Sequence, residues 1–269
     1  MSEALLDSDL VENTAVERTP SRARRIAVAS GKGGVGKTWF ASTLAHNWAL
    51  KGRRTLLFDG DLGLANVDVQ LGLAPETDLS EVIAGRARIE DAVLRGAAEN
   101  LDVIAGSSGT ASLAALPASR LDRLIADLDV FNAGYDRIVL DLGAGVDNTV
   151  RMLAATADTV LVVTTAEPTA MTDAYAFIKL MLLRDPDTDL RVVVNQAASV
   201  KEGEAVYETL RKACDKFLKY TPPLAGIVRI DRRVTDAIRS QSLIMTRHPT
   251  AAAAEDVEKI ARGLRRAFE

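Results

Sequence analysis

The amino-acid sequence predicts an α/β fold in which a doubly wound, mainly parallel sheet carries helices on both faces. Two observations support this fold class: short apolar runs alternate with helix-length segments, and the runs hold Val, Ile and Leu at consecutive positions. Strands covered on both faces lack the polar alternation of half-exposed strands. Regular alternation of strand and helix is typical of a parallel sheet.

The expected elements follow one another without interruption after residue 25. Strands are expected at 26–30, 55–59, 101–105, 137–141, 159–164, 191–195 and 225–229. Helices are expected at 38–50, 117–131, 168–183, 201–219 and 251–268. Because no repeat or low-complexity linker breaks this order, residues 25–269 are expected to form one domain.

The first 24 residues differ from the rest in charge pattern. Acidic residues but no Lys or Arg occur up to Glu17, and arginines then cluster around Pro20. A charge switch without an apolar period predicts a flexible tail. The alternative is an arm that docks on a partner through the apolar residues Leu5, Leu6, Leu10 and Val11.

Composition excludes several classes of protein. With 33 basic and 37 acidic residues the net charge is −4, which argues against a globally basic DNA-coating protein. The single cysteine, Cys214, permits neither an intrachain disulfide nor a thiolate cluster for iron–sulfur or structural zinc. No apolar run reaches the roughly 18–20 residues of a spanning helix, and the acidic N-terminus does not resemble a signal peptide. We therefore expect a cytoplasmic protein.

A glycine-rich loop lies between the first expected strand and the first helix. It consists of Gly31, Lys32, Gly33, Gly34, Val35, Gly36, Lys37 and Thr38. Glycines let backbone N–H groups surround a phosphate, and the helix N-terminus adds positive charge. Lys37 is expected to reach the β- and γ-phosphates, and Thr38 to ligate Mg²⁺. This context predicts a P-loop NTPase.

Polar side chains follow three further strands at the edge where such sheets bind ligands. Asp59 and Asp61 end the second expected strand, and Asp141 follows an apolar strand in the arrangement that holds Mg²⁺ in P-loop enzymes. Asn195 closes a later strand, and its amide can both donate to and accept from adenine. The alternative for Asp59, Asp61 and Asn195 is that they only shape turns.

The second lysine of the loop, Lys32, makes this a deviant Walker A motif, and the sequence resembles the MinD/ParA family of P-loop ATPases. The resemblance implies ATP and Mg²⁺ as cofactors and a homodimer that closes on ATP, with Lys32 reaching the nucleotide of the facing subunit. It further implies that Asp61 positions the attacking water and Asp59 lies beside the Mg²⁺ shell. Asp141 would hold the metal, Asn66 would lie on the dimer face, and Asn195 would contact adenine.

Two segments narrow the resemblance to the FlhG/FleN group, which sets flagellar number and placement in bacteria. These are residues 61–68, Asp-Leu-Gly-Leu-Ala-Asn-Val-Asp, and residues 167–180, which open with Glu-Pro-Thr-Ala-Met-Thr-Asp-Ala. Glu167 and Asp173 would then lie at the dimer face. Expected partners are the FlhF GTPase, a flagellar transcription activator or C-ring proteins, in the cytoplasm, at the membrane or at the cell pole. The chain departs from the group at Leu142, at Arg229 and in its first 24 residues, which lack the motif that stimulates FlhF.

The last expected helix, at about 251–268, is amphipathic. Its apolar residues Val257, Ile260, Ala261, Leu264 and Phe268 have basic residues close by. Such a stripe either packs on the sheet or, as the resemblance to MinD-like proteins implies, lies on anionic lipid when dimerisation doubles its affinity.

Two other functions remain open. A ParA-type DNA-partitioning ATPase would need a basic patch near the C-terminal region, formed by Arg229, Arg232, Arg233 and Arg239. A P-loop metabolic ligase or amidase would need additional substrate-binding segments, for which 269 residues leave little room. The leading interpretation is an ATP-driven dimerisation switch with slow hydrolysis.

Overall fold

A computed structural model describes residues 22–106 and 117–268, with side chains described up to residue 264. The expected tail at 1–24 therefore lies almost wholly outside the described residues. In sheet order, the eight strands are β3 (Val93–Ala98), β4 (Leu101–Ile104), β2 (Thr55–Gly60), β5 (Arg137–Ala144), β1 (Arg24–Ser30), β6 (Thr159–Thr164), β7 (Leu190–Ala197) and β8 (Leu224–Arg229). Every neighbouring pair is parallel except β3 with β4. The expected fold class is confirmed.

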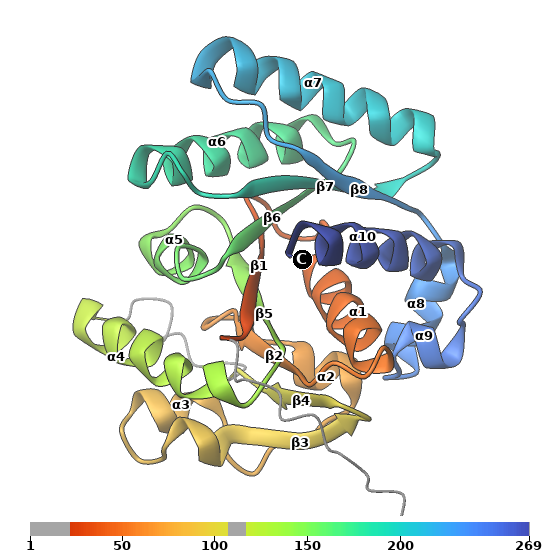
Figure 1. The fold of residues 1–269 in the computed structure, drawn as a ribbon. Helices are drawn as coiled ribbons and strands as arrows, with labels where there is room; N and C mark the ends of the chain where they lie inside the picture. Colours follow the sequence, from red (N-terminus) through yellow and green to blue (C-terminus); the bar gives the residue numbers. More distant parts are fainter. Residues whose placement is uncertain (1–21, 107–116, 269) are drawn as a thin grey trace, which may run out of the picture.

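Helices cover both faces of this sheet (Figure 1). One face is covered by α3 (Leu79–Ile83), α4 (Ala118–Leu128), α5 (Asn148–Ala154), α6 (Pro168–Arg184) and α7 (Val200–Leu218). The other is covered by α1 (Lys37–Leu50), α2 (Val67–Leu71), α8 (Arg232–Arg239), α9 (Ile244–Arg247) and α10 (Ala252–Phe268). Short 3₁₀ turns lie at Ile89–Ala92 and Asp129–Ala133.

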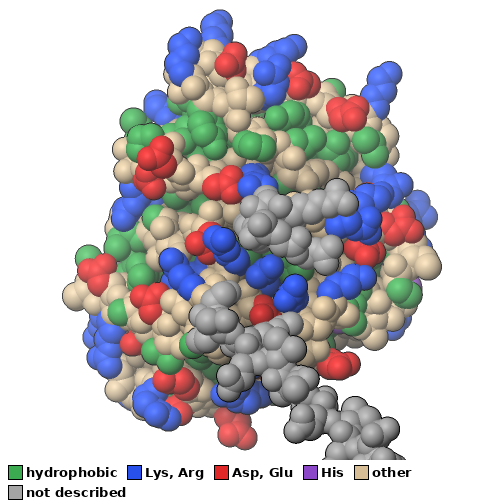
Figure 2. Space-filling view, in the orientation of Figure 1, with side chains coloured by type: hydrophobic (Ala, Val, Ile, Leu, Met, Phe, Trp, Pro, Cys, Tyr) green, Lys and Arg blue, Asp and Glu red, His purple; other side chains and the backbone are tan. Residues whose placement is uncertain are grey.

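Two hydrophobic cores, one on each face, explain why the strand sequences do not alternate. Along β1, Ile26 and Val28 contribute to the core beneath α1 and α10, whereas Ala27 and Ala29 contribute to the core beneath α4–α7. All four side chains are fully buried. Successive side chains point to opposite faces of a strand, so both positions must be apolar. On the outer surface, Lys and Arg side chains are mixed with Asp and Glu (Figure 2).

Sequence reasoning missed β3, the antiparallel edge strand. Its six residues include Arg95 and Gly96, and none of its side chains is fully buried. An edge strand needs little apolar content because only one neighbour pairs with it. The short helices α2, α3, α5, α8 and α9 were also missed, since four to eight residues give no clear helical period.

Helix α10 packs on the sheet through its apolar stripe. Val257, Ile260 and Leu264 are at most 2% exposed, and α10 lies against β8 and α1. Up to Leu264 the stripe is thus part of the core, which is the first of the two alternatives that the sequence left open, and the side chain of Phe268 lies outside the described residues. None of the described helices is long and apolar enough to cross a membrane.

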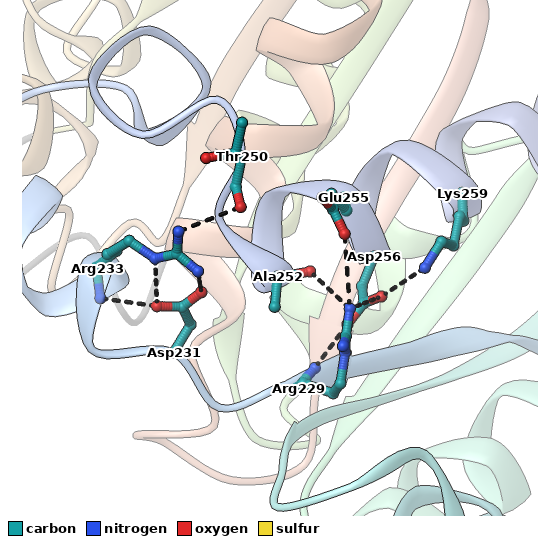
Figure 3. A network of polar contacts seen from close by, with 8 residues as sticks. All are labelled: Arg229, Asp231, Arg233, Thr250, Ala252, Glu255, Asp256 and Lys259. Atoms are coloured by element: carbon teal, nitrogen blue, oxygen red, sulfur yellow. Dashed lines mark hydrogen bonds and ion pairs between the residues drawn. The ribbon is translucent and has the colours of Figure 1, made fainter.

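An ion-pair network joins α10 to the end of β8 (Figure 3). Arg229 donates from Nε to Asp256 Oδ2 at 2.6 Å and from a terminal nitrogen to Oδ1 at 2.9 Å. Lys259 donates to the same carboxylate at 3.1 Å. Burial alone would raise the pKa of Asp256, but these hydrogen bonds outweigh it and hold the pKa below its ordinary value. The Asp256 side chain is only 4% exposed, so this ion pair attaches α10 to β8 beneath the protein surface.

We expect Asp256→Asn to lower the free energy of unfolding by about 1–3 kcal/mol, because the guanidinium of Arg229 loses its charged acceptor. Urea denaturation measures this loss. In the wild type the same stabilisation should begin to fade below about pH 4, where the carboxylate of the unfolded chain takes up a proton, and should be lost once pH falls through the lower pKa of the folded state.

The neighbouring Glu255→Gln change is the control. Glu255 is 52% exposed and its carboxylate lies 3.9 Å from the Arg229 guanidinium, so its loss should cost under about 1 kcal/mol. Equal destabilisation by the two variants would contradict the role assigned to Asp256.

Candidate nucleotide site

The glycine-rich loop lies between β1 and α1, as the sequence predicts, and α1 begins at Lys37. Two glycines in it meet geometric demands that no other residue satisfies easily. Gly36 has φ of +80°, and a Cβ there would lie 2.5 Å from Nδ2 of Asn195. Gly31 packs so closely on α6 that a Cβ would lie 2.3 Å from the backbone carbonyl carbon and oxygen of Asp173. The loop is thus fixed at both ends by its neighbours.

Lys37 and Asp141 form a buried ion pair beneath the loop. Lys37 Nζ lies 2.7 Å from Asp141 Oδ1, and the two side chains are 7% and 1% exposed. Burial raises the pKa of Asp141, and the Lys37 ammonium and the Thr38 hydroxyl only partly offset this. The second oxygen, Oδ2, is buried without a hydrogen-bond partner among the described residues. A buried carboxylate oxygen left over in this way suits a metal ion or its water ligands.

Asp59 is the neighbour of Asp141 across the β2–β5 pair. Its two oxygens accept hydrogen bonds from three backbone N–H groups, those of Asp61, Asn66 and Val67, at 3.0–3.1 Å. Burial, followed by the charge of Asp141, raises the pKa of Asp59 to about 7. Asp59 therefore organises the loop after β2, in addition to lying where we expect the Mg²⁺ shell.

Asp61 occupies that loop, opposite the end of β5. Its Oδ1 accepts a hydrogen bond from the backbone of Leu64 at 3.0 Å. The same oxygen would lie 3.5 Å from a Cβ placed on Gly143, so the carboxylate faces the glycine that follows Leu142. The Leu142 side chain is fully buried in the core. The departure of Leu142 from the family pattern thus lies in the core.

Lys32 does not join Lys37 and Asp141. Its ammonium contacts the Glu167 carboxylate and lies 2.7 Å from the Thr169 hydroxyl, at the start of α6. The Lys32 ammonium lowers the pKa of Glu167. Lys32 is 34% and Glu167 55% exposed, so this pair lies at the surface of the site.

Asn195 lies beside the loop at the end of β7. Its Nδ2 donates to the Val35 carbonyl at 2.8 Å. It also lines a cavity of about 300 Å³, of the size expected for a small-molecule site. The other lining residues include Gly36, Trp39, Gln196, Arg229, Ile230 and Val234. The cavity lies where we expect the adenine pocket.

Gln196 and Trp39 are the site residues that sequence reasoning missed. Gln196 has φ of +57° and donates to the Gly34 carbonyl at 3.3 Å. Trp39 is 7% exposed and lines the cavity beside Asn195. A Trp two residues after the P-loop lysine was a usable signal, whereas nothing in the sequence reveals the backbone conformation of Gln196.

The described residues fit Mg²⁺ better than a metal held by protein alone. No group of three or more His, Cys, Asp and Glu side chains gathers among them. Mg²⁺ typically takes one or two carboxylates and completes its shell with water and phosphate oxygens. Asp141, Thr38 and the neighbouring Asp59 provide such a partial set.

Comparison with known proteins agrees with this geometry. A family model described as an AAA domain matches residues 23–186. The chain is 39% identical over 228 residues to the antiactivator FleN of Pseudomonas aeruginosa, covering 85% of this chain and 81% of that protein. It is 34% identical over 220 residues to the flagellum site-determining protein YlxH of Helicobacter pylori, covering 81% and 70%. It is 30% identical over 218 residues to the septum site-determining protein MinD of Bacillus subtilis, covering 79% and 78%.

Solved structures share the fold. The cell division ATPase MinD of Pyrococcus furiosus superposes with a TM-score of 0.78 at 23% identity, covering 91% of this chain and 99% of that one. The MinD of Pyrococcus horikoshii, solved with Mg-ADP, gives 0.77 at 23% identity, covering 91% and 97%.

The contact between Gly36 and Asn195 yields a test of the loop geometry. We expect Gly36→Ala to destabilise the nucleotide-free protein by more than Gly34→Ala, measured by urea denaturation. Both positions have φ near +80°, but a Cβ at Gly34 meets nothing within 4 Å. Gly34→Ala should therefore cost only the strain of about 1–2 kcal/mol, and Gly36→Ala about 1–3 kcal/mol more.

Removing the clashing amide provides the control for this test. Asn195→Ala in the Gly36→Ala background should recover most of the additional loss, because the atom that clashes with the new Cβ is gone. The destabilisations caused by the two single variants should therefore not be additive. Purely additive effects would show that Asn195 does not constrain the loop.

Proposed function

The chain belongs to the MinD/ParA family of P-loop ATPases, in the branch that contains FleN and YlxH, and we propose that it is an ATP-driven dimerisation switch with slow hydrolysis. In this cycle ATP and Mg²⁺ bind, two subunits close over the nucleotides, and partners recognise the closed state. Hydrolysis then resets the switch.

The observation that carries the proposal is the position of Lys32. The ammonium of this phosphate-loop lysine lies apart from the Lys37–Asp141 pair, on Glu167 and Thr169 at the start of α6. Exchange of a partly exposed ion pair costs little. Lys32 is thus free to leave Glu167 for the phosphates of a facing subunit, and closure gains a charge-assisted contact.

Exposed apolar side chains beside the loop supply a second argument. Leu64 is 76% and Val69 57% exposed, on the segment that Asp59 organises. Asn66, expected on the dimer face, is also exposed there. Burial of apolar surface at this face would favour the dimer by about 25 cal/mol per Å².

Hydrolysis requires in-line attack of water on the γ-phosphorus, with cleavage of its bond to the β-phosphate oxygen. Asp61 would accept a hydrogen bond from that water and aim its lone pair at phosphorus. Lys37 would move from Asp141 to neutralise the phosphates. Asp141 and Thr38 would hold Mg²⁺, which would supply positive charge to neutralise the phosphates.

The biological role follows from the relatives. FleN is called an antiactivator and YlxH a flagellum site-determining protein. We propose that this chain regulates flagellar number or placement, through a flagellar transcription activator, C-ring proteins or the FlhF GTPase. We propose a cytoplasmic location, with reversible association with the membrane or the cell pole.

Membrane binding through α10 is the less favoured part of the proposal. To reach lipid, α10 would have to withdraw Val257, Ile260 and Leu264 from the core, at about 1.5–3 kcal/mol each. The Arg229–Asp256 ion pair would also break. Binding to lipid would have to compensate for this free-energy cost. We therefore favour proteins over the membrane as the binding partners of the closed state.

The DNA-partitioning alternative loses its expected basic patch. Arg229 pairs with Asp256, and Arg233 pairs with Asp231 at 2.8 Å. The hydrogen bond from Arg233 lowers the pKa of Asp231 to about 2, so that carboxylate remains charged. Of the four arginines expected in this patch, these two are neutralised, so the patch offers a phosphate backbone less charge than its sequence indicates.

We expect Asp61→Ala to bind ATP and dimerise but to lose about 100-fold or more in turnover, because the water is no longer oriented. Phosphate release measures turnover, and nucleotide retention on a filter measures binding. An unchanged turnover rate would exclude Asp61 from the reaction.

Lys32→Ala should retain ATP binding and lose ATP-dependent dimerisation, since the proposed contact of Lys32 with phosphate is made only across the interface. Light scattering with ATP and with ADP reports the mass of the particle. Lys212→Ala removes an exposed lysine from α7 and serves as the control. If both variants dimerise like the wild type, Lys32 does not act in trans.

The biological role is tested by ATP-dependent capture from cell lysate with the wild type and with Asp61→Ala. Flagellar regulators or C-ring proteins should be enriched on the Asp61→Ala protein, which accumulates in the closed state. Recovery of chromosomal DNA instead would favour partitioning.

A further inference from the structure

A second cavity lies far from the nucleotide loop, at the opposite end of α1. It has a volume of about 310 Å³ and is lined by Trp48, Lys51, Arg53, Arg137, Glu258 and Arg262, among others. These residues come from the end of α1, the loop that follows it, the start of β5, and α10. Since α1 has 14 residues, about 20 Å separates the cavity from the P-loop.

The cavity is strongly basic in a chain that is acidic as a whole. Besides Arg137, which is engaged in the wall of the cavity, Lys51, Arg53 and Arg262 line it with one carboxylate, Glu258, a formal charge of about +2 against −4 for the protein. Glu258 is shared between Lys51 at 3.1 Å and Arg262 at 3.7 Å. Arg53 forms no ion pair within the described part of the chain. Lys and Arg side chains gather around the end of α10 in Figure 2.

Stabilisation of the end of α1 does not explain these cations. The last carbonyls of that helix already accept backbone hydrogen bonds: Trp48 O from Lys51 N and Arg53 N, and Ala49 O from Gly52 N, at 2.9–3.1 Å. Side chains are thus not needed as caps. Lys51, Arg53 and Arg262 have one carboxylate, Glu258, among them, so they repel one another around the cavity and an anion would relieve that repulsion.

The shape of the donors points to phosphate. Guanidinium groups present paired N–H donors that match two oxygens of a phosphate. The Arg137 guanidinium stacks on the Trp48 ring, 6.0 Å from its centre, and donates to the Asp136 carbonyl, so it forms a fixed wall of the cavity. Lys51 and Arg262 are 59% and 56% exposed, so a ligand can enter from solvent.

We propose that this cavity is a phosphate-ester binding site, separate from the nucleotide site. The ligand is either a free phosphorylated molecule or the headgroup of an anionic lipid. A headgroup bound here would bring the protein to a membrane with α10 still packed in the core. Arg53, Arg262 and Lys51 would hold the phosphate oxygens.

The test uses the full chain with saturating Mg-ADP, so that the P-loop cannot compete for the probe. The protein has two Trp residues, and Trp48→Phe assigns the indole N–H signal of Trp48 in a ¹H–¹⁵N spectrum. Pyrophosphate should shift that signal saturably. Co-sedimentation with phosphatidylglycerol vesicles, compared with phosphatidylcholine vesicles, tests the lipid source.

Arg53→Gln is the decisive variant, because Arg53 lies outside α10 and cannot act through helix insertion. It should weaken binding of the effective probe about tenfold or more. Arg95→Gln, on β3 and 69% exposed, is the control and should bind as the wild type does.

Saturable, Arg53-dependent binding of pyrophosphate alone identifies a free phosphate ester, and Arg53-dependent binding to phosphatidylglycerol identifies a headgroup. Either outcome supports the site. The proposal is overturned if neither probe binds the wild type, or if Arg53→Gln and Arg95→Gln bind equally.

Discussion

The buried pair of Lys37 and Asp141 is the interaction around which the site is arranged. Two charges removed from water cost several kcal/mol each, and one hydrogen bond at 2.7 Å returns only part of this. Asp59 adds a third buried ionisable group next to them in the sheet. The surrounding fold maintains this arrangement through strands buried on both faces. A phosphate with its metal would supply the charges that the three side chains cannot balance among themselves.

Much of the fold and the site was readable from the sequence because it is encoded locally. The P-loop, the carboxylates at strand ends and Asn195 each follow an apolar run within a few residues. In a parallel sheet, all strands deliver their C-terminal ends to one edge, so local motifs assemble there without further information.

What was missed depends on contacts between distant segments. Lys32 and Glu167 are 135 positions apart, and no spacing rule predicts their contact. The sequence pattern predicted an apolar stripe on α10. It could not distinguish a stripe covered by protein from one covered by lipid. Arg229 looked like part of a basic patch, yet its partner Asp256 lies 27 residues further along. Charge counted along a sequence overestimates charge presented at a surface.

The close approach of Gly31 to Asp173 has a mechanical consequence. Backbone rests on backbone at this point, without a compliant side chain between them. The phosphate loop and the first turns of α6 are therefore sterically coupled, and a displacement of the loop would displace α6 as well. Helix α6 runs 17 residues along the outside of the sheet. A displacement at its first turns would therefore move its far end, at a surface remote from the nucleotide.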